Sequence, residues 1–182
     1  MFEELVVRAG ASPSGMPTWL RRFTESLMPV LARHSPVVFF AMVLGGEEPL
    51  DLIQRRTIAE PDVHPLVERV MRIHIAEEAR HISYARTAIE AEAPQLSRAR
   101  RHTVAFFTPL ALGIMARLML RPNHDLAAAG VPVEVIRATD RSEAGRRLLV
   151  DGVAKVRRLF VELDLVTPPA RWMWRRFGLW PH

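Results

Sequence analysis

The sequence contains no cysteine, which excludes several kinds of site at once. Disulfide frameworks, zinc ribbons, iron–sulfur clusters and a thiol nucleophile all require cysteine sulfur. Histidine and carboxylate side chains are then the good metal ligands that remain. Lysine is almost as scarce, because Lys155 is the single lysine among 25 basic residues. The net charge of +5 is spread along the chain, whereas nucleic-acid binding usually concentrates charge on one face, so we expect no nucleic-acid partner.

The chain also lacks a recognisable export signal and a convincing membrane span. Residues 1–15 contain no basic segment followed by an apolar one. The most apolar stretch, 103–120, contains Pro109 and Arg117, which favours a core helix kinked at the proline. With 182 residues, 49% of them hydrophobic, the chain is long enough to bury a core. We expect a single helical domain over residues 1–182, cytoplasmic and without a membrane segment.

Apolar residues recur at helical spacing through most of the chain, and no segment alternates as a strand would. The sequence therefore predicts an all-α fold. The expected helices cover about 18–27, 36–58, 65–91, 97–120, 132–138 and 142–163, with an interruption of the second one at Gly45, Gly46 and Pro49. An aromatic and basic tail follows, and its aromatic side chains are expected to pack on the domain.

The helix expected over 65–91 carries three potential metal ligands on one side. At about 100° per residue, His74, Glu78 and His81 project within an arc of about 60°. The same stripe continues through apolar residues at positions 67, 71, 85 and 88, so it is expected to face the core. Burying a carboxylate and two imidazoles is costly unless a cation compensates them. The alternative is a solvated helix whose charged residues, such as Glu77 and Arg80, only pair at its surface.

Glu78 and His81 form a Glu-x-x-His pair, which is half of the ligand motif of di-iron carboxylate bundles. In those bundles two helices each supply Glu-x-x-His and two others each supply a glutamate. The helix expected over 36–58 contains Glu47 and Glu48 in an apolar context, and one of the two fits that glutamate. The alternative is that both are exposed at a break in the helix.

The run from Leu44 to Arg86 resembles the p-aminobenzoate N-oxygenase (AurF-like) di-iron oxygenases. The resemblance is carried by Glu47, the segment His64-Pro65-Leu66 and the spacing His74-x-x-x-Glu78-x-x-His81, and it continues in the C-terminal segment 159–179. It implies a ferritin-like helical bundle in which Glu47, His74, Glu78 and His81 are metal ligands, with Glu48 as the competing choice for Glu47. The implied cofactor is a pair of iron ions, or manganese, that activates dioxygen. The implied substrate is a small molecule, an arylamine in the best-known members.

The chain departs from the family pattern because Glu78–His81 is its one Glu-x-x-His. The first two helices of the bundle and their ligands have no counterpart, so this chain is expected to hold half of the metal site. We expect either a truncated form of a longer protein, a subunit completed by a partner, or a half-bundle that forms a homodimer. A two-fold axis would supply two copies each of Glu47, Glu78 and His81. Two other functions remain open: a non-catalytic helical remnant that acts through association, and a ferritin-like metal-handling protein.

Several other polar residues are not assigned as metal ligands. The remaining histidines are expected to be structural or exposed: His34, His64, His102, His124 and His182. Asp51 follows Glu47 by one turn and either orients a ligand or faces solvent. Tyr84 and Arg80 lie close to the predicted ligands along the helix, and each is either a supporting group or ordinary packing.

Overall fold

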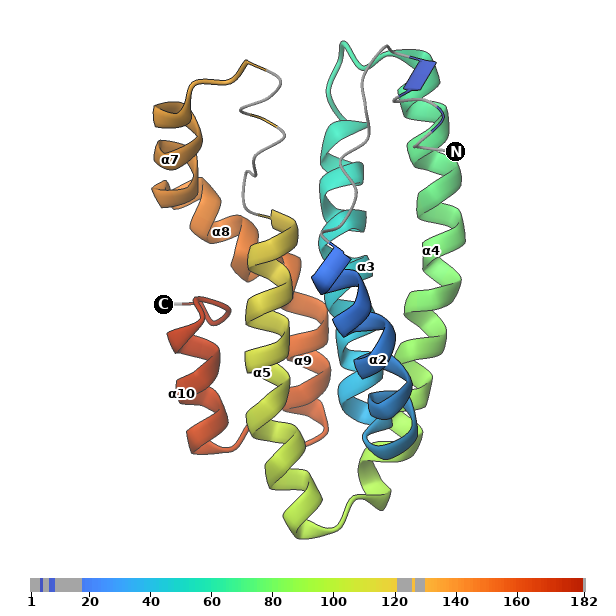
Figure 1. Cartoon of the computed structure of the whole chain (residues 1–182), viewed down its shortest axis with the longest axis vertical. Helices are drawn as coiled ribbons and strands as arrows, with labels where there is room; N and C mark the ends of the chain where they lie inside the picture. Colours follow the sequence, from blue (N-terminus) through green and yellow to red (C-terminus); the bar gives the residue numbers. More distant parts are fainter. Residues whose placement is uncertain (1–3, 5–6, 9–17, 121–125, 127–129, 182) are drawn as a thin grey trace.

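In a computed structural model of the protein, the residues described are 4, 7–8, 18–120, 126 and 130–181, and among them every regular element is a helix (Figure 1). This confirms the all-α prediction and agrees with a ferritin-like helical bundle. The helices are α2 (Thr18–His34), α3 (Pro36–Thr57), α4 (Pro65–Glu92), α5 (Arg98–Leu120), α7 (Val133–Arg141), α8 (Glu143–Gly152), α9 (Ala154–Glu162) and α10 (Pro168–Arg176), with a short 3₁₀ turn η1 (Ala93–Gln95) after α4. None of these helices combines the length and the apolar character needed to cross a membrane.

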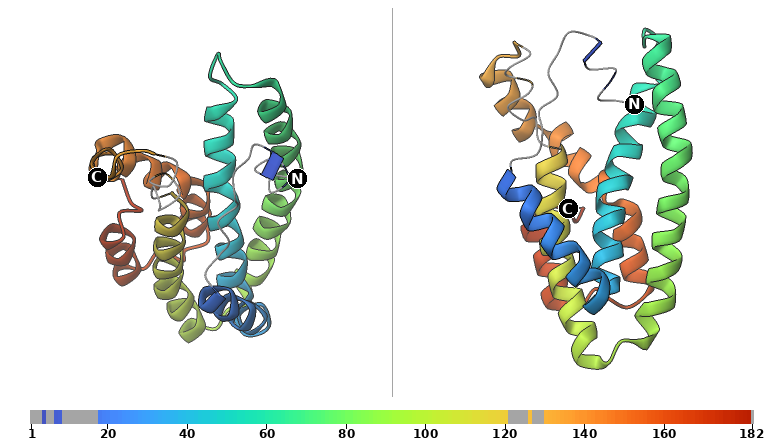
Figure 2. Two further views of the ribbon diagram at one scale, coloured as in Figure 1. Left: turned by 45° about the horizontal axis from the view of Figure 1, so that its top comes forward. Right: turned by 45° about the vertical axis from the view of Figure 1, so that its right-hand side comes forward.

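Two long helices, α3 and α4, form an antiparallel pair joined by a short turn (Figure 2). Both begin with proline in the first turn, where a missing backbone N–H costs nothing. The His64 side chain precedes α4 as its N-cap, and its Nδ1 accepts the Leu66 N–H at 3.2 Å. α4 lies at the edge of the bundle and packs mainly on α3 (Figure 1). One flank of α4 is therefore left without a covering helix among the described residues.

α3 is continuous across the positions where an interruption was expected. Gly45 is buried against α5, and a β-carbon there would collide with the Leu112 side chain. Glycine at this position lets α3 and α5 approach closely, so its role is in packing between helices and not in breaking one. Pro49 lies inside the same helix without ending it.

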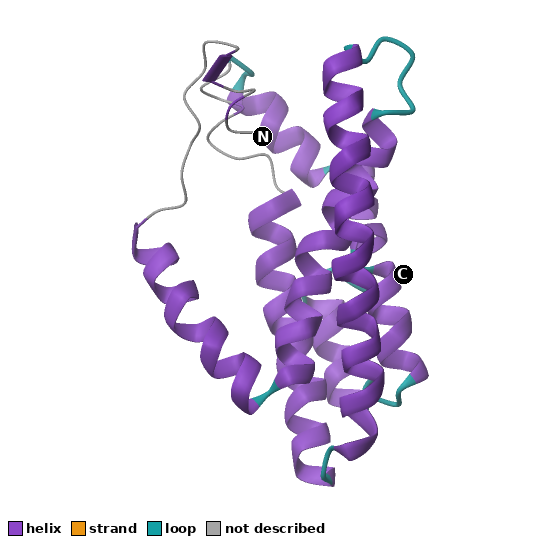
Figure 3. Cartoon of the chain, turned by 90° about the vertical axis from the view of Figure 1, so that its right-hand side faces the viewer, coloured by secondary structure: helices purple, strands orange, loops and turns teal. Residues whose placement is uncertain are grey.

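Two other predicted boundaries differ from the structure. α2 continues to His34 and includes Pro29, although the sequence suggested an end near Leu27. The helix expected over 142–163 is divided at Val153 into α8 and α9. α2 contacts α3 near its C-terminal end and diverges from the bundle toward its N-terminal end (Figure 3).

Most aromatic residues of the C-terminal segment pack on the domain, as the sequence predicts, but Trp172 is 61% exposed. Trp174 is fully buried and makes edge contacts with Phe160 and Trp180 at ring separations of 6.5 Å. The guanidinium groups of Arg157 and Arg171 lie over the Trp180 ring at 5.9 and 5.3 Å. This cluster anchors α9 and α10 against the rest of the bundle, on the side away from α4 (Figure 1).

Candidate metal centre

The antiparallel pairing of α3 and α4 determines which of their residues meet. In an antiparallel hairpin, a residue farther from the turn on one helix lies opposite a residue farther from the turn on the other. Glu47 is seven residues farther from the turn than Gln54, and His81 is seven residues farther from it than His74. Glu47 and Gln54 are seven residues apart and so share one face of α3. The pairing therefore sets Glu47 beside the Glu78–His81 turn and Gln54 beside His74.

Glu47, Glu78 and His81 converge at the centre of this hairpin. Each offers a ligand atom within 4.8 Å of the others, and no other such group of three acidic or histidine side chains occurs in the part of the chain that the structure describes. The Oε2 of Glu78 lies 3.0 Å from Nδ1 of His81, and its Oε1 lies 3.4 Å from Nε2 of His74. The structure thus brings together all four residues that the sequence singled out, with Glu78 in contact with the other three.

The two carboxyl groups of the cluster are in hydrogen-bonding contact, and their pKa values shift in opposite directions. Burial, the hydrogen bond to Glu78 and the charge of Glu78 raise the pKa of Glu47 to about 7, while His81 opposes the shift. The hydrogen bond from Glu47 lowers the pKa of Glu78, which accepts it as the carboxylate. A proton between two acids is the arrangement expected where like charges meet without a cation.

Glu48, the competing choice for the α3 ligand, points elsewhere. Its Oε2 accepts the Val156 N–H at 2.9 Å, at the N-terminal end of α9. The side chain is buried, and desolvation raises its pKa to about 7 against the opposing effects of that hydrogen bond, Lys155 and Arg86. Asp51 is also buried away from the cluster, and it binds Arg55 at 2.8 Å and Lys155 at 3.4 Å. Of the two adjacent glutamates, Glu47 is the one that reaches the cluster.

The cluster lies at an open edge and not in the interior, which corrects the predicted core-facing stripe. The exposed side-chain fractions are 12% for Glu78, 22% for His74 and 62% for His81. α4 buries Val70, Ala85 and Ile89, whereas the stripe positions 67, 71 and 88 are half-buried. The reason is the position of α4 at the edge of the bundle, where α3 is its main packing partner (Figure 3).

Comparison with known proteins agrees with the chemistry of this cluster. The sequence profile of the family described as p-aminobenzoate N-oxygenase AurF matches residues 1–164. The chain belongs to the AurF family. Members are oxygenases of the di-iron type, so the resemblance seen in the sequence is confirmed. No solved structure gives a significant match to the chain.

The relatives found among curated proteins are themselves uncharacterised. Proteins of Mycobacterium tuberculosis (strain CDC 1551 / Oshkosh) and Mycobacterium bovis (strain ATCC BAA-935 / AF2122/97) are each 38% identical to the chain over 178 residues. The match covers 96% of this chain and 52% of each relative. The chain thus spans about half the length of these AurF-family relatives.

The donors in the cluster suit the metal ions that the AurF family implies. Two carboxylates and two imidazoles without thiolate are the donors preferred by iron(II), manganese(II) and zinc(II). A cation would also stabilise the ionised form of Glu47, against the burial and the contact with Glu78 that raise the pKa of this carboxyl group. The residues present therefore fit one half of a dinuclear centre.

The remaining histidines do not join the cluster. His34 ends α2, His64 caps α4 and His102 is exposed on α5, while His124 and His182 fall outside the described residues. Tyr84 is exposed, and its ring makes an edge contact with Phe40 at 5.6 Å. Arg80 is exposed as well, so neither residue is shown to support a ligand.

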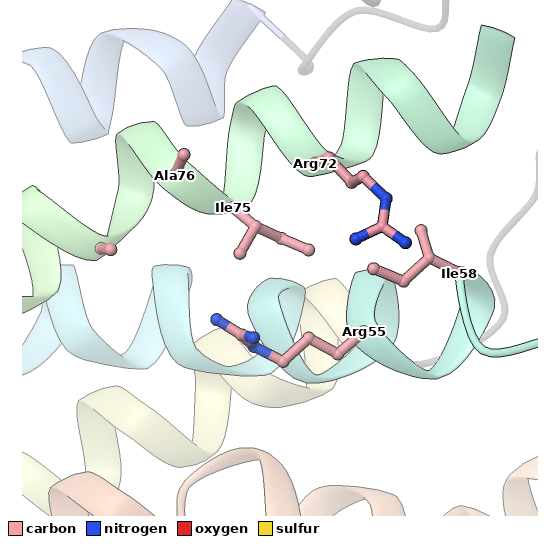
Figure 4. Close-up of a pocket in the computed structure, with 6 residues that line it drawn as sticks. Arg55, Ile58, Arg72, Ile75 and Ala76 are labelled. Carbon is pink, nitrogen blue, oxygen red and sulfur yellow. The ribbon is translucent and has the colours of Figure 1, made fainter. Parts of the chain in front are cut away.

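An open groove of about 310 Å³ lies nearby between α3 and α4 (Figure 4). It is lined by Arg55, Ile58, Arg72, Ile75, Ala76 and Ala79, which include none of the four predicted ligands. Arg55 is paired with Asp51, and Arg72 is paired with Glu68 at 2.8 Å, so neither charge is available without loss of an existing contact. The groove is on the flank of the hairpin and is distinct from the carboxylate cluster.

Sequence analysis assigned no role to one polar residue of the site, Gln54. Gln54 is buried on α3, and its Nε2 lies 3.0 Å from Nδ1 of His74. One signal in the sequence points to it: the seven-residue spacing between Glu47 and Gln54 matches the seven residues between His74 and His81.

Proposed function

We propose that this chain contributes half of the dinuclear metal centre of an AurF-type oxygenase, with Glu47, His74, Glu78 and His81 as its ligands. The main observation in favour is the convergence of one ligand atom each from Glu47, Glu78 and His81 within 4.8 Å. Iron is the metal that the family implies, and manganese is the alternative. The proposed reaction is addition of oxygen to a small organic molecule, such as the nitrogen of an arylamine.

The proposed metal ligands have different parts in this function. Glu78 lies between His74 and His81 and holds both imidazoles toward the same point. Glu47 gives up its proton when a cation binds, so cation binding and deprotonation of Glu47 are linked. A bound ferrous pair supplies the electrons that activate dioxygen.

The chain alone does not meet the ligand count of a di-iron centre. Such a centre uses two Glu-x-x-His pairs and two further glutamates, and the 182 residues contain one Glu-x-x-His. We propose that a second pair of helices, carrying a glutamate and another Glu-x-x-His, packs across the open edge beside α4. That pair would also exclude water from His81, whose side chain is 62% exposed. It belongs to further sequence of a longer protein, to a partner polypeptide or to a second copy of this chain.

The proposal is tested by the metal affinity of two variants at adjacent positions. Glu78→Gln removes the carboxylate that contacts both imidazoles, and Glu77→Gln makes the same chemical change at an exposed position one residue away. Anaerobic iron(II) titration, with metal content measured after desalting, should show binding to the wild type and to Glu77→Gln. Glu78→Gln should bind at least tenfold more weakly. Equal affinities for Glu77→Gln and Glu78→Gln would contradict the assignment.

A further inference from the structure

We propose that Gln54 is a positioning residue that selects which nitrogen of His74 faces the metal. This inference rests on the proposed function, because it concerns how one of the proposed ligands is held. Gln54 touches neither a reacting atom nor the carboxylates in any recorded contact. It acts through the His74 ring.

The contacts of the His74 ring fix the location of its proton. The Nδ1 atom lies 3.0 Å from the amide nitrogen of Gln54, which is a donor and cannot accept a proton. Nδ1 must therefore accept, and in a neutral ring the proton then resides on Nε2. Nε2 lies 3.4 Å from Oε1 of Glu78, which can accept its proton. In this arrangement, Gln54 and Glu78 together select the Nε2–H tautomer.

A metal-bound His74 needs the opposite tautomer. Nε2 is the nitrogen that faces the carboxylates, so it is the one available as a ligand, and a ligating nitrogen carries no proton. The ring remains neutral when Nε2 releases its proton to solvent and Nδ1 takes one up. Nδ1–H then requires an acceptor in place of the Gln54 amide nitrogen.

The amide oxygen of the Gln54 side chain provides that acceptor. Its Oε1 atom is fully buried and has no hydrogen-bond partner among the described residues. Rotation of the amide by half a turn exchanges Nε2 and Oε1 with little change in shape, and Oε1 then accepts Nδ1–H. Gln54 can therefore form a hydrogen bond with either tautomer of His74. Metal-bound histidines usually donate their other nitrogen to such an acceptor, which orients the ring.

Two substitutions at position 54 separate this role from simple packing. Gln54→Glu keeps the length and offers acceptor oxygens, which favour Nδ1–H, whereas Gln54→Met keeps the bulk and removes the hydrogen bond. Gln95→Met is the matched control, because Gln95 is exposed in η1 and bonds only the Ala91 carbonyl in the recorded contacts. Circular dichroism establishes that each variant retains its helices.

The first measurement is the tautomer of His74, read from the two-bond proton–nitrogen NMR spectrum. The metal-free wild type and Gln95→Met should show Nε2–H, and zinc(II), a diamagnetic probe, should convert the ring to Nδ1–H with Nε2 coordinated. Gln54→Met should show a mixture of tautomers without metal. A metal-free Gln54→Met spectrum identical to that of the wild type would overturn the proposal.

The second measurement is zinc(II) affinity by calorimetric titration. Gln54→Met should bind about tenfold more weakly than the wild type, and Gln54→Glu at least as tightly as the wild type. If Gln54→Glu is weakened as much as Gln54→Met, Gln54 does not act as an acceptor and the proposal fails. If the wild type binds no zinc, the proposed function fails instead, and the metal-free spectra still decide whether Gln54 controls the ring.

Discussion

At the scale of single residues, the site is defined by how adjacent side chains divide between two sides of α3. Glu47 turns toward Glu78 and His81, and Glu48 turns toward the backbone of α9. Both carboxyl groups have a pKa raised to about 7, mainly by burial. Their titrations affect different properties, because Glu47 lies in the cluster and Glu48 lies in the packing between helices.

For Glu47 we expect metal affinity to depend on pH around neutrality. A cation must displace the proton that Glu47 holds below about pH 7, so affinity should rise with pH up to that value and then level off for this group. Between pH 7 and pH 6 the loss for one competing proton is about fivefold, because the unprotonated fraction of Glu47 falls from about one half to about one tenth. Zinc(II) titrations at several pH values measure it. Glu47→Gln should bind weakly with a flatter profile, and a wild-type affinity independent of pH in this range would contradict the assignment.

For Glu48 we expect stability to depend on pH in the absence of metal. Its folded-state pKa of about 7 exceeds the ordinary value of 4.5, so the folded state holds the proton more tightly. The contribution of Glu48 to stability therefore falls as pH rises from about 4.5 to 7, and the cost is complete above pH 7. Glu48→Gln removes the charge and keeps an oxygen for the Val156 N–H.

Chemical denaturation should find Glu48→Gln more stable than the wild type by about 2 kcal/mol at pH 8, with the difference disappearing below pH 5. A wild type that equals or exceeds Glu48→Gln at pH 8 would show that the ionised carboxylate is fully compensated at the α9 terminus.

At the scale of elements, two adjacent glycines of α3 test how closely the helices pack. A β-carbon at Gly45 would collide with the buried Leu112 side chain of α5, whereas at Gly46 the nearest atom is the Met115 sulfur at 3.8 Å. Gly45→Ala should destabilise the protein by about 1–3 kcal/mol because α5 must move. Gly46→Ala should be neutral or stabilising by up to about 1 kcal/mol, as alanine favours the helix. Thermal denaturation of both variants without metal provides the comparison, and equal effects would refute the packing argument.

The elements also show what the sequence can and cannot predict. Proline at the start of α3 and of α4, together with helical periodicity, gave those two helices to within one or two residues. Helical spacing grouped His74, Glu78 and His81 but left Glu47 and Glu48 open, and the family resemblance favoured Glu47. The break at Val153 was not predictable locally, because the start of α9 is stabilised by Glu48 from a helix more than 100 residues earlier. Gln54 was missed because a glutamine has no chemistry of its own until its partner, His74, is known.

At the scale of the whole molecule, the open edge beside α4 determines whether the site is complete. If a second copy supplies the missing ligands, iron(II) should double the mass measured by light scattering and give two metal ions per pair of chains. His81→Ala should abolish the metal-dependent doubling, while His102→Ala, an exposed change on α5, should leave it intact. A mass that stays that of one chain with metal bound would rule out completion of the site by a second copy.

The opposed orientations of Glu47 and Glu48 also constrain how α3 can respond to a ligand. A helix held on one side by a cation and on the other by the end of α9 cannot turn about its own axis without losing one of the two attachments. A displacement of α3 on metal binding would then move α9 and with it Phe160, whose ring contacts Trp174. The tryptophan fluorescence of the C-terminal segment would then report metal binding at the cluster on the opposite side of the bundle.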